Sequence, residues 1–197
     1  MSATASTMLE LGTQAPEFSL PDVVTCQTIS LGSFAGQRAL LVMFICQHCP
    51  FVKHVKAELA RLGQDCGARG VAVVGISSND PAVSSEDSPD GLKRMVANWG
   101  LNFPVCYDES QAVAKSYRAA CTPDSFLFDA SRRLVYRGQL DDSRPSNGKP
   151  VTGADLRGAI DALLAGHPIT LDQKPSLGCN IKWRPGNQPQ YFAPSRK

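Results

Sequence analysis

Ala39-Leu40-Leu41-Val42-Met43-Phe44-Ile45-Cys46-Gln47-His48-Cys49-Pro50 is the stretch that decides the predicted fold. Its first seven residues are apolar, and an unbroken apolar run of this length predicts a strand covered on both faces of a sheet. Pro50 is tolerated in the first turn of a helix, and apolar residues then recur at spacings typical of one helix face: Phe51, Val55, Leu59 and Leu62. The stretch therefore predicts a buried strand followed by an amphipathic helix with two cysteines at its start.

The segments that follow predict further alternating helices and strands. Residues 71–76 repeat the buried-strand pattern, which gives a strand, helix, strand unit with a parallel crossover. Ser88-Pro89 offers a cap and a first-turn proline for a helix that ends near Trp99. Other expected elements are a strand at 103–107, a helix at 110–120, an antiparallel hairpin of 125–128 with 134–137, and a helix opened by a capping box of Thr152 and Asp155 that closes at Gly166. We therefore predict an α/β protein with a mixed central sheet flanked by helices.

The length and the end segments predict a single domain with decorations. A chain of 197 residues can bury one full core. Residues 1–10 are small and polar and are expected to form a flexible arm, followed by one domain over 11–166. Residues 167–197 contain five prolines and no hydrophobic period, which predicts a tail that packs on the domain or is partly disordered.

Charge and hydropathy exclude several classes of partner. The net charge of +2 comes from 20 basic and 18 acidic residues spread along the chain, so neither a nucleic acid nor a membrane surface is expected as a partner. No stretch approaches the roughly 18 consecutive apolar residues of a membrane span, and residues 1–11 lack the pattern of a secretory signal. A soluble cytoplasmic protein is the expectation, in which the seven cysteines are reduced, catalytic or metal-binding.

The cysteine pair carries the predicted chemistry. A thiolate is the nucleophile in disulfide exchange, and a helix N-terminus stabilises negative charge, so we expect a lowered pKa for Cys46. Two intervening residues place Cys49 within one turn, where it can attack a mixed disulfide and release the product. His48 between them can add a positive charge. We therefore predict Cys46, Cys49 and His48 as catalytic residues.

Thr122-Pro123 is the second element of the predicted site. Pro123 stands at the entry of the strand predicted at 125–128, where a cis proline beside the dithiol would offer the backbone of Thr122 to an extended substrate. An ordinary trans proline in a turn is the alternative. The order of the elements favours the cis proline, so Thr122 and Pro123 are predicted to bind substrate.

The CxxC could instead bind a metal or form a structural disulfide. Zinc sites built on CxxC need a second ligand pair at comparable spacing, and the sequence has none, so no metal site is predicted from spacing. Cys46, Cys49, Cys179 and a histidine (His48 or His54) could still assemble a zinc or copper site in space. A structural disulfide is possible as well, although a strand-to-helix junction is an unusual place for one. The acidic loop 77–91 is interpreted as a solvated connection because its acids lack the spacing of a calcium loop.

Three further segments carry a resemblance to a known family: Ala15-Pro16-Glu17-Phe18-Ser19-Leu20-Pro21-Asp22, Leu31-Gly32-Ser33-Phe34-Ala35-Gly36 and Cys121-Thr122-Pro123-Asp124-Ser125-Phe126. Together with the CxxC they resemble the redoxin branch (AhpC/TSA type) of the thioredoxin superfamily. The chain is most similar to its peroxiredoxin-like group, which has CxHCP, CTPD and GCxIKW motifs. The resemblance spans residues 11–183 and implies a thioredoxin-like fold with an N-terminal hairpin and one inserted helix and strand.

The same resemblance implies a function. Cys46 corresponds to the attacking cysteine, Cys49 to its resolving partner and Pro123 to the cis proline. The expected activity is that of a thiol-disulfide oxidoreductase acting on a protein or small-molecule disulfide. No cofactor is implied, and electrons would come from thioredoxin, glutathione or another dithiol donor.

The chain departs from the family pattern at three positions. Peroxiredoxins have a threonine three residues before the peroxidatic cysteine, where this chain has Met43 before Cys46 and Cys46 before Cys49. An antioxidant thiol peroxidase is therefore kept as an alternative only. Thioredoxins have a buried aspartate six residues before the first cysteine and a tryptophan directly before it, where this chain has Leu40 and Ile45. Another base would have to deprotonate the resolving thiol.

The remaining cysteines fall into two groups. Cys121 borders the predicted cis proline and either takes part in redox chemistry or fills the core. Cys179, in Gly178-Cys179-Asn180-Ile181-Lys182-Trp183, is a candidate third redox thiol or an anchor of the tail. Cys26, Cys66 and Cys106 are predicted to be structural.

Overall fold

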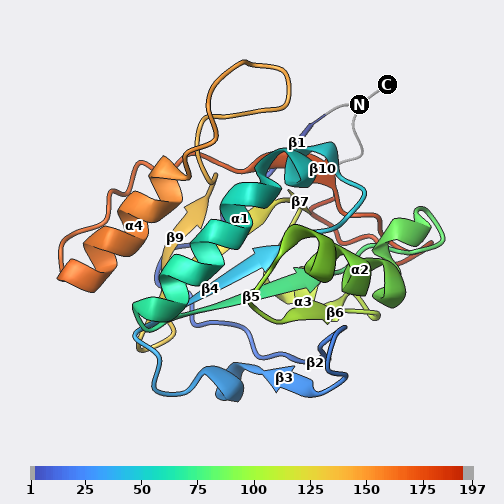
Figure 1. Ribbon diagram of the computed structural model, residues 1–197, viewed down its shortest axis with the longest axis horizontal. Helices are drawn as coiled ribbons and strands as arrows, with labels where there is room; N and C mark the ends of the chain where they lie inside the picture. Colours follow the sequence, from blue (N-terminus) through green and yellow to red (C-terminus); the bar gives the residue numbers. More distant parts are fainter. Residues whose placement is uncertain (1–2, 193–197) are drawn as a thin grey trace.

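The computed structural model describes residues 3–192, and a five-stranded sheet lies at its centre (Figure 1). The strand order is β6-β5-β4-β8-β9. The strands β4 (Ala39–Phe44), β5 (Val71–Ser77) and β6 (Val105–Tyr107) are parallel. The strand β8 (Asp124–Asp129) is antiparallel to β4, and β9 (Leu134–Gly138) returns antiparallel to β8. The predicted mixed sheet and its hairpin are confirmed.

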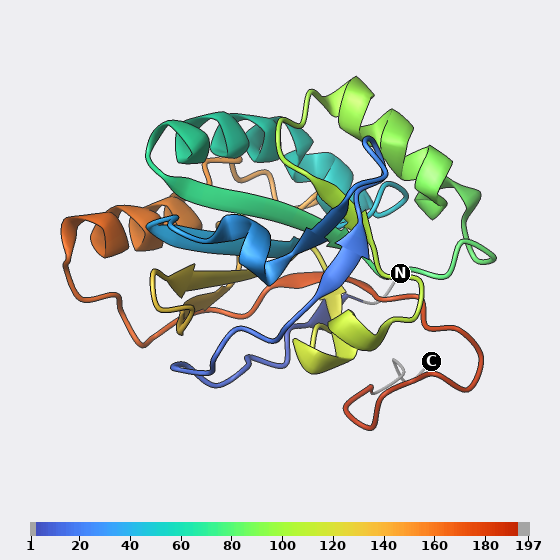
Figure 2. The ribbon, with the colours of Figure 1, turned by 90° about the horizontal axis from the view of Figure 1, so that it is seen from below.

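Helices and chain segments cover both faces of this sheet (Figure 2). The helices α1 (Pro50–Ala68), α2 (Pro89–Trp99) and α4 (Ala154–Ala165) share a hydrophobic cluster with Leu41 and Met43 of β4. The opposite face, which carries Leu40 and Val42, packs against α3 (Ala112–Ser116), the N-terminal segment and the tail. All six residues of β4 are buried, as predicted for a strand covered on both sides.

The structure confirms two of the predicted helix starts and contradicts a third. Helix α1 begins at Pro50 with Cys49 as its N-cap, and the Ser88 hydroxyl accepts the Gly91 N–H at 3.2 Å to cap α2. The predicted capping box of Thr152 is wrong, because α4 begins after Gly153, which has φ +67°. The Thr152 N–H donates to Asp141 Oδ2 at 2.6 Å instead. Helix α3 has only five residues, so the helix predicted over 110–120 was too long.

Two smaller sheets extend the core. The strands β2 (Ser19–Pro21) and β3 (Thr28–Ser30) form the implied N-terminal hairpin, and a 3-10 turn (Leu31–Phe34) follows it. The second sheet has the order β1-β10-β7 and joins β1 (Thr4–Ala5), β10 (Leu177–Asn180) and β7 (Cys121–Thr122). The described part of the predicted flexible arm is therefore tied down, because β1 pairs with β10. Residues 1–2 lie outside the described residues.

The C-terminal segment packs on the domain as far as it is described. Ile181 and Trp183 are buried in the cluster on the α3 side of the sheet. Of the two alternatives for the tail, packing holds for this segment because these two apolar side chains need a covered surface. Residues 193–197 of the predicted tail lie outside the described residues.

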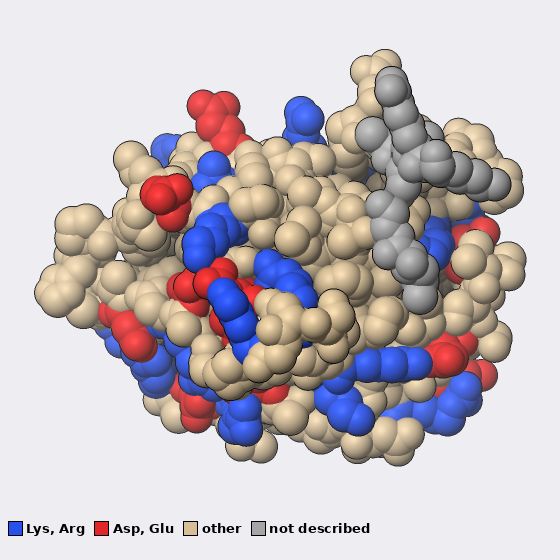
Figure 3. All heavy atoms as spheres, turned by 90° about the horizontal axis from the view of Figure 1, so that it is seen from above, with Lys and Arg blue, Asp and Glu red and all other residues tan. Residues whose placement is uncertain are grey.

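The surface shows no single dominant charge on the face drawn in Figure 3, where basic and acidic side chains are interspersed. This mixture agrees with the small net charge of +2. Between residues 3 and 192, no helix combines the length and the apolar character that a membrane crossing requires.

Candidate active site

The two cysteines of the CxxC lie where β4 ends and α1 begins, as the sequence predicted. The connection leaves β4 at the middle of the sheet and places Cys49 at the N-cap of α1, directly before Pro50. Both cysteine side chains are fully buried. All seven cysteines of the chain are free in this structure.

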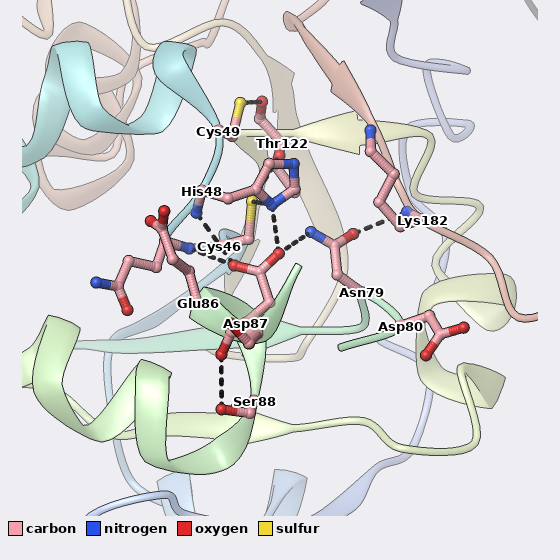
Figure 4. Close-up of polar contacts among 12 residues, drawn as sticks. Cys46, His48, Cys49, Asn79, Asp80, Glu86, Asp87, Ser88, Thr122 and Lys182 are labelled. Atoms are coloured by element: carbon pink, nitrogen blue, oxygen red, sulfur yellow. Dashed lines mark hydrogen bonds and ion pairs between the residues drawn. The ribbon is translucent and has the colours of Figure 1, made fainter. Parts of the chain in front are cut away.

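The predicted substrate-binding pair faces this dithiol. The Thr122–Pro123 peptide bond is cis, which confirms that prediction. Thr122 Oγ1 lies 3.3 Å from Cys46 Sγ, and Cys49 in its thiol form donates to the Thr122 carbonyl oxygen at 3.2 Å. Figure 4 shows both sulfur atoms pointing toward Thr122. The fold therefore brings together Cys46, Cys49, Thr122 and Pro123 from two distant parts of the sequence.

Asp87 is a site residue that the sequence interpretation missed. It ends a 3-10 turn (Ser85–Asp87) and is completely buried. Its Oδ1 accepts the backbone N–H groups of Gln47 at 2.8 Å and His48 at 3.1 Å, and its Oδ2 accepts Asn79 Nδ2 at 2.8 Å (Figure 4). Asp87 therefore fixes the backbone between the two cysteines, and interpreting loop 77–91 as a purely solvated connection is wrong.

The order of the strands and loops along the chain could have indicated Asp87 as a site residue. The parallel strands β4 and β5 are neighbours, so the loops at their carboxyl ends meet at one edge of the sheet. Asp87 lies in the loop after β5, and the CxxC lies in the loop after β4. An acid at the end of this loop, just before a helix, was therefore a candidate for contact with the dithiol.

His48 connects Asp87 to the first cysteine. Its Nδ1 forms an ion pair with Asp87 Oδ2 and lies 3.8 Å from Cys46 Sγ. The His48 side chain is 18% exposed, whereas Asp87 is fully covered. His48 thus lies over Cys46 and gives the buried carboxylate a partner, which agrees with its predicted place beside the thiols.

The pKa of Cys46 is raised above the ordinary value of a cysteine thiol, and that of Cys49 is lowered below it. Burial, a hydrogen bond with Cys49 and the nearby charge of Asp87 raise the pKa of Cys46 well above the ordinary value. Hydrogen bonds from Cys179 and Cys46 lower the pKa of Cys49 far below it. The expectation that the helix N-terminus would lower the pKa of Cys46 is therefore wrong, because Cys49 is the residue that caps α1.

Cys179 also reaches the site. It lies in β10, opposite Thr122 in the register between β10 and β7, and its side chain is buried. A hydrogen bond to Cys49, together with burial, raises the pKa of Cys179 above its ordinary range. Of the two roles predicted for Cys179, anchoring of the tail and redox chemistry, the structure is compatible with both.

Cys121 lies next to the site without joining it. Its Sγ approaches the carbonyl oxygens of Pro123 at 3.7 Å and Ser176 at 3.9 Å. Burial and the nearby Asp124 carboxyl raise its pKa well above the ordinary value. These contacts agree with a packing role, and a redox role for Cys121 stays a prediction.

The other three cysteines lie in different surroundings. Cys66 and Cys106 are buried in the two hydrophobic clusters, and burial raises the pKa of Cys66 to about 11 and that of Cys106 to about 12. Their predicted structural role agrees with this placement. The same prediction for Cys26 is wrong, because Cys26 is exposed in the hairpin loop and has φ +60°.

Thioredoxins have a buried aspartate six residues before the first cysteine. In this chain Leu40 stands at that position and packs in the cluster on the α3 side of the sheet. A different buried carboxyl group, that of Asp124, lies near this end of the sheet. Asp124, directly after Pro123, is fully buried, and burial raises its pKa to about 7. Its Oδ2 accepts the Ala120 N–H at 3.5 Å, but its Oδ1 has no partner. Asp124 can therefore hold or release a proton near neutral pH.

One cluster has the composition of a metal site. Cys46 Sγ, His48 Nδ1 and a carboxylate oxygen of Asp87 lie within 4.8 Å of one another. Sulfur and imidazole ligands suit zinc or copper. However, the Asp87 carboxylate already accepts hydrogen bonds on both oxygens, from His48, Gln47 and Asn79. A metal would have to displace part of this network.

A shallow pocket opens beside Pro123. Residues from α1, β10 and the loop after β9 line it, among them Phe51, His54, Arg144 and Leu177. Two buried nitrogen atoms of these residues, His54 Nε2 and Arg144 Nε, have no hydrogen-bond partner in the structure. The pocket therefore places two unpaired polar nitrogen atoms close to the cis peptide bond.

Known proteins resemble this chain in sequence over much of its length. The model of the AhpC/TSA family matches residues 11–137. Among curated proteins, thiol-disulfide oxidoreductase ResA of Bacillus thuringiensis subsp. konkukian is 25% identical over 134 residues, which cover 67% of this chain and 71% of that protein.

Solved structures share the fold. An uncharacterized conserved protein from Geobacillus kaustophilus has 52% identity and a TM-score of 0.92, covering 94% of this chain and 98% of its own. A thiol:disulfide interchange protein of the thioredoxin family from Chlorobium tepidum has 22% identity and a TM-score of 0.60, covering 79% of this chain and 98% of its own. The second likeness shows the fold alone, and that fold is thioredoxin-like.

Proposed function

Because this chain belongs to the AhpC/TSA family, in the redoxin branch of the thioredoxin superfamily, we propose that it is a thiol-disulfide oxidoreductase whose redox centre is the pair Cys46 and Cys49. The observation that carries this proposal is the position of the two thiols at the start of α1, where Cys46 Sγ lies 3.3 Å from the Thr122 hydroxyl and Cys49 Sγ 3.2 Å from the Thr122 carbonyl oxygen, beside the cis Thr122–Pro123 bond. The likeness to a curated thiol-disulfide oxidoreductase supports it.

The proposed reaction begins at Cys49. In the reduced protein Cys49 is the thiol with the lowered pKa, so its thiolate attacks one sulfur of a substrate disulfide. A mixed disulfide forms, and the other substrate sulfur leaves as a thiol. Cys46 then attacks Cys49 Sγ, which creates the Cys46–Cys49 disulfide and releases the second substrate thiol. This order is the reverse of the predicted one, because burial and the charge of Asp87 raise the pKa of Cys46.

The surroundings of the dithiol suit a substrate with an extended chain. Pro123 directly follows the short strand β7, is partly exposed and lines the pocket together with Phe51 and Arg144. We propose that a protein or small-molecule disulfide binds beside Pro123. A dithiol donor such as thioredoxin or glutathione would reduce the resulting disulfide, and the proposed compartment is the cytoplasm.

An insulin reduction assay with dithiothreitol tests this function. We expect turnover by the wild type, loss of turnover in Cys49→Ser, and unchanged turnover in the matched control Cys26→Ser, since Cys26 is exposed and lies in the hairpin loop. Alkylation at increasing pH, mapped by mass spectrometry, should label Cys49 at a lower pH than Cys46. Turnover that persists in Cys49→Ser would contradict the proposed order of attack.

A metal-binding module is the second candidate, because Cys46, His48 and Asp87 form the cluster described above. Metal analysis of protein purified under reducing conditions tests it. Stoichiometric zinc or copper that is lost in both Cys46→Ser and His48→Asn would favour this candidate over disulfide exchange.

The peroxidase alternative is tested in the same preparation by stopped-flow mixing with hydrogen peroxide. A reaction no faster than that of a free thiol excludes this alternative.

A further inference from the structure

Three thiols of this protein lie along the backbone of β7. Cys46 Sγ approaches the Thr122 hydroxyl, Cys49 Sγ contacts the Thr122 carbonyl oxygen, and Cys179 is the register partner of Thr122. Cys46, Cys49 and Cys179 are also buried in one and the same hydrophobic cluster. The three thiols therefore lie around a single residue, Thr122.

We propose that Cys179 is a second resolving thiol, so that Cys49 pairs alternately with Cys46 and with Cys179. This inference rests on the proposed function and extends it to the C-terminal segment. The Cys179 thiolate attacks Cys49 Sγ in the Cys46–Cys49 disulfide. The Cys49–Cys179 bond forms as the Cys46–Cys49 bond breaks, and Cys46 leaves as a thiolate that takes up the proton lost by Cys179. The exchange conserves electrons and needs no further reactant.

The charge state of Cys49 controls when Cys179 can react. In the reduced protein the interaction with an ionised Cys49, together with burial, raises the pKa of Cys179. Once Cys49 is part of a disulfide it carries no charge, so this effect ends. The Lys182 ammonium, which lowers the pKa of Cys179, stays in place. Oxidation of Cys49 therefore makes Cys179 a better nucleophile.

The fold holds Cys179 in this place by close backbone contact. A side chain at Gly178 would lie 1.9 Å from the Thr122 carbonyl oxygen, so only glycine lets β10 approach β7 this closely. On its other edge β10 pairs with β1, where Gly178 lies opposite Thr4. After β10, the Lys182 N–H donates to Asn79 Oδ1 at 2.8 Å, and Asn79 in turn donates to Asp87 (Figure 4). The network that fixes the CxxC therefore also fixes the end of β10.

Disulfide mapping in Cys46→Ser tests the proposal directly. The full-length variant is equilibrated with oxidised and reduced glutathione, quenched with acid, alkylated and mapped by mass spectrometry. We expect a Cys49–Cys179 disulfide in this variant and in Cys46→Ser/Cys121→Ser, which removes the neighbouring buried thiol. In Cys46→Ser/Cys179→Ser we expect loss of that linkage and retention of glutathione on Cys49. A folded Cys46→Ser protein that keeps glutathione on Cys49 and forms no Cys49–Cys179 linkage would overturn the proposal.

Two readouts separate this proposal from the proposed function. Linkage mapping uses glutathione and needs no protein substrate, so absence of insulin turnover would overturn the proposed function and leave the mapped linkage as an independent result. In the wild type we expect both the Cys46–Cys49 and the Cys49–Cys179 disulfides at equilibrium, with the second lost in Gly178→Val, whose side chain pushes β10 away from Thr122. An unchanged distribution of disulfides in a folded Gly178→Val protein would count against the proposal.

Discussion

Asp87 and Asp124 are both completely buried near the dithiol, yet their pKa values move in opposite directions. Burial alone would raise the pKa of Asp87, but hydrogen bonds from His48 and Asn79 outweigh it and lower that pKa below the ordinary value. Asp124 has weaker support, with one oxygen unpartnered, and burial raises its pKa to about 7. The comparison shows that the supply of donors, and not burial alone, decides whether a buried carboxyl is charged.

The two carboxyls therefore have different roles in the folded protein. Asp87 is a charged positioning residue that holds the backbone of Gln47 and His48. Asp124 is a weakly acidic group at the start of β8, and its Oδ2 accepts the Ala120 N–H. Substitutions at the two carboxyls and at the groups around the dithiol test this difference.

Asp87→Ala is expected to have the largest effect. It leaves the Gln47 and His48 N–H groups without an acceptor and removes the partner of His48. Breaking a buried ion pair costs about 3–5 kcal/mol, so urea unfolding at neutral pH should show a loss of about that size. Glu86→Gln is the matched control, since Glu86 is half-exposed and forms a surface ion pair with Lys53. A change in Asp87→Ala no larger than in this control would refute the role assigned to Asp87.

Asp124→Asn should change how stability depends on pH. The folded pKa of about 7 lies above the unfolded value near 3.8, so the stability contributed by Asp124 is complete below the unfolded value and is lost as pH rises through the folded one. Between about pH 5 and about pH 8 the wild type should lose about 2–3 kcal/mol through this group, and Asp124→Asn should not. Urea titrations at both pH values measure the difference, and parallel curves for the two proteins would contradict it.

His48→Asn should have a smaller effect on stability and a specific effect on Cys46. The variant loses the ion pair to Asp87, and because His48 is partly exposed we expect a cost of about 1–2 kcal/mol. The uncompensated charge of Asp87 should raise the pKa of Cys46 further, so alkylation of Cys46 should need a higher pH. His54→Asn serves as the control, since His54 Nε2 has no hydrogen-bond partner. Equal alkylation profiles for the two variants would show that His48 does not act on Cys46.

Thr122→Val should have the smallest effect. It removes the hydroxyl that lies 3.3 Å from Cys46 Sγ, a contact that lowers the pKa of Cys46, and it leaves the backbone carbonyl that contacts Cys49 in place. One neutral hydrogen bond contributes about 0.5–1.5 kcal/mol. The Thr122 side chain lowers the pKa of Cys49 as well, so the pH of half-maximal alkylation should rise for both cysteines. An unchanged alkylation profile at both cysteines would contradict the role assigned to the hydroxyl.

Much of the fold could be predicted because it depends on local patterns. The apolar runs at 39–45 and 71–76 became β4 and β5, and Ser88-Pro89 opened α2, since periodicity, caps and turn residues act within a few positions. Thr152 does not cap α4, because its N–H donates to the carboxylate of Asp141, which lies outside the local motif. Two-residue β1 carries no pattern of its own, so its pairing with β10 could not be anticipated.

Some residues of the candidate site could be predicted from the sequence, and others could not. The CxxC at a strand-to-helix junction and the cis Thr122–Pro123 bond were predictable from spacing and element order. Asp87 was not, because an acid in a polar loop is usually solvated, and only the packing of that loop against residues 47 and 48 buries it.

The sequence by itself determined the central strand, the helix that follows it and the presence of two thiols at their junction, since these depend on neighbouring residues alone. The tertiary structure decided which groups surround each thiol and in which direction they move its pKa. Charges and hydrogen bonds act through space, so the pKa values of Cys46 and Cys49 depend on Asp87 and Cys179, which lie 38 or more positions away along the chain.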